Sequence, residues 1–303
     1  MAIPRHIHRT SAYSLIFSTH SDKHLWSRQL LHKTVFQVSA VISWRFKMPH
    51  AIADVVDISP NLHIRSKLKP KSQSREARSL SVQLDRYQSH YEDSQLAQTI
   101  HRQLSAMLKN AQGPITKVLS LGLGSLLVAK GQSRRLKQLV ILLAIRDILR
   151  QKLDISIQVY AQDPTFTRKD ESFLENLGIR ILRTPSGSEL GEASIVLDTS
   201  TLVYSPFLTL EAYGQLLGDE RSVQYLFGDD FDALLHKWPK QSAERMEVEE
   251  IVKNGLGSYR RRPVIDEDFW TTEDSTFPMA IYERSRKSRK RMQNANLWRK
   301  TIR

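Results

Sequence analysis

Short apolar segments of strand type alternate with helical segments from Val118 to Trp238, and this alternation restricts the fold more than any other feature of the chain. Strands are expected over residues 118–121, 155–160, 179–182, 194–197, 202–204 and 223–227, and helices over 134–151, 168–177, 210–217 and 231–238. Strands that alternate with helices form parallel sheets with helices on both faces. We therefore expect an α/β, Rossmann-like, mostly parallel sheet whose ligand crevice lies at the carboxyl ends of its strands.

The first expected strand runs into a glycine turn, Gly122-Leu123-Gly124-Ser125. Two glycines one residue apart let the backbone turn tightly and approach a ligand closely, and a helix that follows would present N–H groups to an anion. A full dinucleotide fingerprint needs a third glycine three residues after the second, where this chain has Val128. A structural corner is the preferred interpretation, and a phosphate or cofactor site is the alternative.

Six residues, glycines and polar residues at three expected strand ends, are the candidates for binding a ligand. They are Gly122, Gly124 and Ser125 after the first strand, Asp163 after the second, and Thr201 and Tyr204 at a later strand. Because the carboxyl ends of parallel strands meet at one edge of a sheet, we expect these residues to line one crevice. A carboxylate after the second strand can bind the ribose of a cofactor, but Asp-Pro is also an ordinary turn, so both roles of Asp163 stay open. The sequence identifies neither a catalytic residue nor a particular cofactor.

An acidic corner, Gly228-Asp229-Asp230-Phe231, precedes one of the expected helices. An N-cap is the preferred role for Asp229 or Asp230, although paired carboxylates also bind metals or act as acid and base. The histidines show no zinc-site spacing, and the chain has no nucleophile elbow, phosphate-binding loop or H-E-x-x-H motif. We therefore expect no metal site.

Residues 1–80 are expected to be a leader and linker, and residues 81–282 the folded domain, which a helix over 84–110 begins. The first 50 residues carry seven Lys and Arg residues and one acidic residue, Asp22. Such a composition is typical of an organelle transit peptide. A leader without fixed structure, or extra residues ahead of a start at Met48, accounts for it equally well.

The formal net charge of +13 is concentrated in residues 283–303, which contain nine basic residues and one acidic residue. We expect a basic, disordered tail in which Arg284–Arg291 could bind nucleic acid or direct nuclear import. A solvated tail without such a role is the alternative. The chain has no cysteine, which fits a reducing intracellular compartment, and it has no apolar run long enough to span a membrane.

Several short motifs together resemble the sensitivity-to-red-light-reduced-like domain family over residues 110–240. They are Gly122-Leu123-Gly124-Ser125, Gln138-Leu139, Asp163-Pro164-Thr165-Phe166-Thr167, Leu174 and Leu177-Gly178. The resemblance implies a Rossmann-like intracellular domain. Members are linked in plants to circadian and light-signalling regulation, and elsewhere to haem-related regulation and cytoskeletal phenotypes. The resemblance provides no catalytic residues to transfer.

Two later motifs depart from the family pattern. Residues 201–208 lack the histidine and cysteine that follow an aromatic residue and proline in the family, and Gly228–Phe231 replaces Gly-Asn-Ser-Phe. We therefore expect a protein that keeps the fold and has lost or altered any activity of the family. The preferred function is a regulatory or accessory protein of the cytoplasm or nucleus that binds a small ligand or a protein partner. Mitochondrial import through the leader is the alternative location.

Two further functional hypotheses stay open. The first is an enzyme that uses an adenosyl or nicotinamide cofactor at the corner Gly122–Ser125. The second is a nucleic-acid-associated protein that acts through the basic tail.

Overall fold

The computed structural model describes residues 75–111, 113–187, 189–218, 223–274, 276 and 278–285. The expected leader, most of the expected linker and the basic tail from residue 286 onward therefore lie outside the described residues. No helix in the described part of the chain combines the length and apolar character that a membrane span requires.

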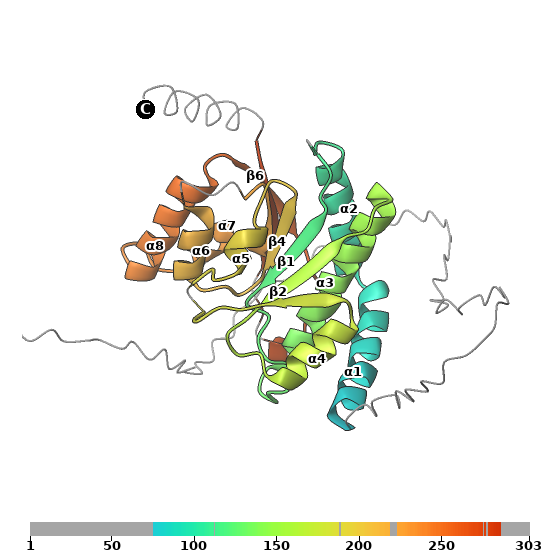
Figure 1. Cartoon of the computed structure of the whole chain (residues 1–303). Coiled ribbons are helices and arrows are strands. Elements are labelled where there is room, and N and C mark those ends of the chain that lie inside the picture. Colours follow the sequence, from blue (N-terminus) through green and yellow to red (C-terminus); the bar gives the residue numbers. More distant parts are fainter. Residues whose placement is uncertain are drawn as a thin grey trace, which may run out of the picture. The chain divides into compact units, whose positions relative to one another are not determined.

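A sheet of seven strands in the order β3-β2-β1-β4-β5-β7-β6 forms the centre of the domain (Figure 1). Five strands are parallel, namely β1 (Lys117–Leu121), β2 (Gln158–Gln162), β3 (Ile179–Leu182), β4 (Thr201–Ser205) and β5 (Tyr225–Asp229). Two more, β6 (Tyr259–Val264) and β7 (Met279–Arg284), complete the sheet in antiparallel pairing. The strand order reverses between β1 and β4, where open α/β sheets place their ligands.

Helices cover both faces of the sheet, as the alternation predicts (Figure 1). One layer consists of α1 (Arg75–Glu92), α2 (Gln95–Leu108), α3 (Gln132–Leu153) and α4 (Arg168–Asn176). The other consists of α5 (Ala193–Val196), α6 (Leu210–Leu217), α7 (Phe231–Lys237) and α8 (Ala243–Ile251), which a π-helical turn at Val252–Leu256 extends. A short 3-10 helix, Thr272–Asp274, precedes β7.

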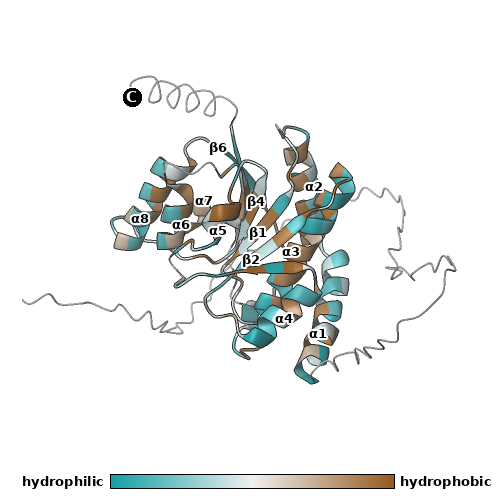
Figure 2. Ribbon diagram, in the orientation of Figure 1, coloured by the Kyte–Doolittle hydropathy of each residue, from teal (hydrophilic) through white to brown (hydrophobic). Residues whose placement is uncertain are grey.

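Two apolar clusters, one on each side of the sheet, form the core. Alternate residues of β1 belong to opposite clusters, since Val118 packs with α3 while Leu119 and Leu121 pack with α6. Both faces of the strands are therefore apolar, which is why the strands are short continuous apolar runs rather than alternating ones. Figure 2 shows the brown apolar colour on the central strands and on the sheet-facing sides of the helices.

The expected single helix over residues 84–110 is two helices. Helix α1 starts at Arg75, inside the expected linker, and buries Leu80 at 3% exposure. It ends before Ser94, whose side chain caps α2 by accepting a hydrogen bond from the backbone N–H of Ala97. An N-cap residue has extended backbone angles, so the chain turns there although the apolar spacing continues.

The expected strand over residues 194–197 is wrong, because Ala193–Val196 forms the single helical turn α5. The side chain of Ser194 donates to the carbonyl of Gly191, and Leu197 N–H donates to the carbonyl of Ala193. These local bonds compete with strand pairing in a short segment. The two antiparallel strands β6 and β7 were also not predicted, and Glu283 and Arg284, expected in the tail, belong to β7.

Candidate functional site

The glycine corner follows β1 directly, and hydrogen bonds within the protein hold it in place. Gly122 and Gly124 both have φ of +76°, a conformation that favours glycine. The N–H of Gly124 donates to Asp163 Oδ2 over 2.8 Å, and the N–H of Ser125 donates to Thr165 Oγ1 over 3.1 Å. Asp163 in turn accepts from the N–H of Thr165 over 2.8 Å. The predicted neighbours Gly124 and Asp163 therefore do meet, but they bind each other, and the backbone of Ser125 binds Thr165 beside them.

A second carboxylate, Asp170, fixes the far side of the same corner. It is fully buried and accepts from the Ser125 hydroxyl and from the N–H of Leu126, both over 2.8 Å. It also forms the capping box of α4 with Thr167. The sequence analysis did not include Asp170, although a threonine followed three residues later by an acidic residue is a helix-start signal. Three successive N–H groups of the corner thus have side-chain acceptors, so the corner is a closed structural turn.

Arg135 of α3 lies against the corner from the helix side. A Cβ placed on Gly124 would approach Arg135 Cδ to 2.6 Å, so any side chain here would force Arg135 to move. Desolvation is the main cause that lowers the pKa of Arg135, and the neighbouring Arg134 acts in the same direction. Asp163 and Asp170 oppose this effect. The corner therefore combines two carboxylates and one arginine in a compact unit.

A cavity of about 610 Å³ lies next to the corner, between the β1–α3 loop, the amino end of α4 and helix α1. Its lining contains Leu127 from the loop and Leu80 from α1 as apolar groups. The polar and charged groups of the lining are Glu76, Ser79, Gln83, Gln132, Thr167, Arg168 and Lys169. This is the concave site that the fold places near the carboxyl ends of β1 and β2. None of the six predicted binding residues lines it.

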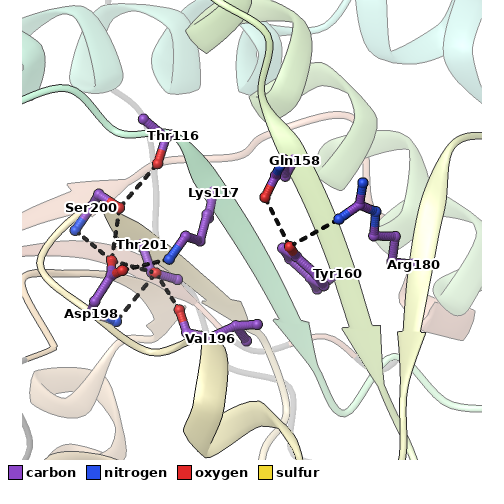
Figure 3. Close-up of polar contacts among 9 residues, drawn as sticks. All are labelled: Thr116, Lys117, Gln158, Tyr160, Arg180, Val196, Asp198, Ser200 and Thr201. Atoms are coloured by element: carbon purple, nitrogen blue, oxygen red, sulfur yellow. Dashed lines mark hydrogen bonds and ion pairs between the residues drawn. The ribbon is translucent and has the colours of Figure 1, made fainter.

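Thr201 does not belong to this edge, contrary to the prediction. It is the first residue of β4 and pairs with Lys117, the first residue of β1, so it lies at the amino end of the sheet. Figure 3 shows it in a polar cluster where it donates to the carbonyl of Val196 over 2.7 Å and to Asp198 over 3.1 Å. The prediction grouped Thr201 with the carboxyl end of a strand that it precedes, and the pairing with Lys117 places it at the amino end.

Asp198 is the centre of that polar cluster. Burial raises its pKa, but hydrogen bonds from Lys117, Ser200 and Thr201 outweigh burial and lower the pKa to about 2. On the adjacent strand, Tyr160 donates to Gln158 over 2.8 Å (Figure 3). The Asp198 cluster joins the amino ends of β1 and β4, whereas the Tyr160 bond stays within β2, and both indicate a structural role.

Tyr204 is also separate from any ligand-accessible surface. Its side chain is fully buried between β4 and α3, where the hydroxyl donates to the carbonyl of Gln138 over 3.2 Å. Its ring packs edge-on against Phe227 at a centroid distance of 5.5 Å. Tyr204 is therefore a core residue with a satisfied hydroxyl, and the expectation that it borders the crevice is wrong.

The family to which these elements belong follows from a sequence comparison. The model of the SRR1 domain matches residues 88–294, more than half of the chain. The chain belongs to the SRR1 domain family. This confirms the resemblance seen in the short motifs and extends it beyond residues 110–240 to both antiparallel strands.

No curated protein sequence matches this SRR1 domain protein. Among solved structures, it is similar to the plantazolicin methyltransferase BamL in complex with a triazolic desmethylPZN analog and SAH. The two are 14% identical, the similarity covers 68% of this chain and 92% of that chain, and the TM-score is 0.31. A likeness this distant carries no argument about what the SRR1 domain binds.

The acidic corner of this SRR1 domain contains two carboxylates with different environments. Asp230 is the N-cap of α7, accepts from the N–H of Asp232, and forms an ion pair with Arg261 over 2.5 Å. Asp229 is buried at 5% exposure, and it accepts from the N–H of Phe207 over 3.1 Å and the Tyr213 hydroxyl over 3.2 Å. Desolvation raises the pKa of Asp229 to about 7.

Asp229 holds a strained part of the SRR1 domain. Phe207 has φ of +67°, which is unusual for a bulky residue, and the N–H of that residue is the one that Asp229 accepts. The guanidinium of Arg134 lies 5.0 Å above the Phe207 ring. Within the described residues, no group of three or more His, Asp or Glu side chains is arranged to hold a metal ion.

Proposed function

We propose that this SRR1 domain protein is an intracellular regulatory or accessory protein that binds a small polar ligand or a short segment of a protein partner in the cavity beside the glycine corner. The cavity volume of about 610 Å³ is the observation that supports this function most directly. Clefts of roughly 300–1,000 Å³ are the usual size for small-molecule sites. The proposed compartment is the cytoplasm or nucleus, and import into mitochondria through the leader is the alternative.

The lining of the cavity indicates the chemistry of the ligand. Hydroxyl and amide groups of Ser79, Gln83 and Gln132 can donate and accept hydrogen bonds, and Arg168 and Lys169 are exposed cations at its edge. Leu80 and Leu127 add an apolar surface. These groups favour a ligand that carries an anionic group and a small apolar part.

An ion pair across the cavity offers a link between binding and regulation. Lys169 Nζ of α4 lies 2.5 Å from Glu76 Oε2 of α1, and both side chains are more than half exposed. Exposed pairs of this kind contribute little to stability. A ligand anion can therefore replace Glu76 as the partner of Lys169, and such an exchange would release the first turn of α1 from α4.

Native mass spectrometry of molecules that co-purify with the full chain tests this function, together with thermal-shift measurements on a panel of anionic metabolites. Leu127→Trp places a large side chain in the cavity and should abolish both signals. The matched control is Val128→Trp, because Val128 is the next residue, is 54% exposed and does not line the cavity. Equal binding by both variants would show that the cavity is not the site.

The cofactor-dependent enzyme remains the second hypothesis, and the corner geometry weighs against it. An adenosyl or nicotinamide cofactor bound at Gly122–Ser125 would have to displace the bond between Asp163 and Gly124. Hydrogen exchange separates the two hypotheses. A ligand in the cavity should protect residues 76–83 and 167–169, whereas a cofactor that opens the corner should change exchange at residues 122–126.

The nucleic-acid hypothesis depends on the basic tail. Arg284 belongs to β7, where its guanidinium lies 5.5 Å from the Tyr259 ring, so the candidate binding run shortens to residues 286–291, outside the described residues. Binding through that run should weaken steeply with salt and disappear when residues 286–303 are removed. Unchanged binding after this deletion would exclude the tail as the contact.

A further inference from the structure

A second concave surface lies on the opposite layer of helices, between α6 and α8. This groove has a volume of about 310 Å³. Leu210, Leu217 and Ile251 give it apolar sides, and Glu211, Glu247 and Glu250 give it acidic ones. We call it the acidic groove. It shares no residue with the cavity beside the glycine corner, so an inference about it is independent of the proposed function.

No ion pair within the described residues neutralises the carboxylates of the acidic groove. In the part of the chain that the structure describes, none of Glu211, Glu247 and Glu250 forms an ion pair. Their neighbour Glu249 on α8 does, since it pairs with Arg245 over 2.8 Å. Desolvation raises the pKa of Glu247, and repulsion from Glu211, Glu244 and Glu250 raises it further. Like charges that repel one another around an apolar groove favour a cationic occupant with some apolar surface.

The basic tail leaves the domain beside this groove. The N–H of Ser285 donates to the carbonyl of Ser258 over 2.8 Å, so the two residues are in contact. Ser258 directly follows the turn Val252–Leu256 and Gly257, and two residues of that turn, Asn254 and Gly255, line the groove. The residue before the tail therefore contacts Ser258, which lies three residues along the chain from Gly255 in the groove wall.

The composition of the tail complements the groove. Residues 286–303 contain eight basic and no acidic residues, and they include the apolar pair Leu297-Trp298. An extended chain advances about 3.3–3.6 Å per residue, so the first few tail residues can reach across the groove. Attachment to the same chain gives an effective concentration on the order of millimolar, which makes a weak contact sufficient.

We propose that the acidic groove between α6 and α8 binds residues 286–303 of the same chain, with the basic side chains against Glu211, Glu247 and Glu250. The tail then has two alternative states, docked on its own domain or available to another polyanion. This contact would limit non-specific binding of the basic tail to nucleic acid or acidic surfaces.

Paired cysteines test the contact in the full chain, which has no cysteine of its own. Asn254→Cys with Ser288→Cys places one thiol on the groove wall and one in the tail. The control pair is Gln83→Cys with Ser288→Cys, because Gln83 lines the other cavity. We expect a disulfide within one chain to form about tenfold faster in the groove pair than in the control, because docking raises the effective concentration of the thiols.

Charge dependence completes the test. The triple change E211Q/E247Q/E250Q, or about 0.5 M salt, should slow disulfide formation in the groove pair and leave the control pair unchanged, because both remove the electrostatic attraction but not the attachment of the tail near Ser258. Lys253→Cys, at an exposed neighbouring position, repeats the measurement if Asn254→Cys affects folding. Equal rates for the two pairs, or a rate that neither neutralisation nor salt changes, would overturn the proposal. Disulfide-linked dimers in place of monomers would overturn it by assigning the groove to the tail of a second copy.

Discussion

The backbone N–H of Gly124 donates to the carboxylate of Asp163 over 2.8 Å, and this bond joins the ends of two neighbouring parallel strands. The two residues are 39 positions apart in the chain. The 22 residues of α3 account for most of that separation. An acidic residue that would be free to bind a ribose in a nucleotide site is here a fixed part of the turn.

Removal of the Asp163 carboxylate should therefore destabilise the protein rather than merely weaken ligand binding. Asp163→Ala leaves the N–H groups of Gly124 and Thr165 without their acceptor and should lower the free energy of unfolding by about 1–3 kcal/mol. Asp163→Asn keeps one carbonyl oxygen and should cost less. Urea unfolding of both variants is the measurement, and equal losses would show that hydrogen bonding is not the cause.

Gly124→Ala should destabilise the corner by about 1–2 kcal/mol, because its φ of +76° disfavours a side chain and the new Cβ meets Arg135. Gly113→Ala is the control, since a Cβ at Gly113 has no atom within 4 Å. Thermal unfolding measures the stability of the Gly124→Ala and Gly113→Ala variants against that of the unchanged protein. In the double variant G124A/R135A the cost should be less than the sum of the two single costs, because the steric part disappears. Strict additivity would contradict the contact.

Asp229 should make stability fall as pH rises. Desolvation raises its folded-state pKa to about 7, so the folded protein binds more protons than the unfolded chain from about pH 4 to pH 7. The resulting loss of unfolding free energy across that window is on the order of 4 kcal/mol as an upper limit. Asp229→Asn should remove the slope, whereas Asp232→Asn, at a side chain that is 55% exposed, should retain it. Chemical unfolding at several pH values gives the slope, and identical slopes in all three proteins would exclude Asp229 as its source.

The elements that could be predicted are those whose local sequence signals, such as apolar runs, glycines and helix caps, agree with the tertiary structure. The run Val118–Leu121 is apolar, buried on both faces and followed by glycines with positive φ, so strand and turn were both evident. The helix α4 likewise begins and ends where its capping signals place it. By contrast, the apolar spacing through Asp93 and Ser94 continues unbroken, although the chain turns there to cap α2.

The site was harder to predict because its residues come from distant segments. The cavity combines Leu127 with Leu80 of α1, a helix that sequence analysis placed partly in a linker. Tyr204 has the residue type of a binding group, but its burial against α3 depends on packing that spacing alone does not define. The sequence pattern therefore identified the glycine corner and the segments near it. Which side chains are exposed to a ligand depends on the tertiary packing, which the pattern does not define.

A buried ion pair holds α3 to the segment before β7, and no sequence pattern indicated it. Lys137 Nζ lies 2.6 Å from Asp274 Oδ2, and the two side chains are 2% and 1% exposed. The ammonium group also donates to the carbonyl of Phe269 over 2.8 Å and lies 5.3 Å from the Phe269 ring centroid and 5.6 Å from that of Tyr87. Aromatic faces add a favourable interaction with a cation.

Lys137→Met should lower the free energy of unfolding by about 3–5 kcal/mol, because it leaves the Asp274 carboxylate buried without its counter-ion. The double variant K137M/D274N removes that uncompensated charge and should recover a large part of the loss, since the amide oxygen of the introduced asparagine can still accept a hydrogen bond from Thr271 or Ser133, as the Asp274 carboxylate does in the native protein. Urea unfolding of the two single variants and the double variant gives the coupling energy between the two positions. A coupling near zero would mean that the pair contributes packing alone, and that the aromatic rings rather than Asp274 hold α3 to this segment.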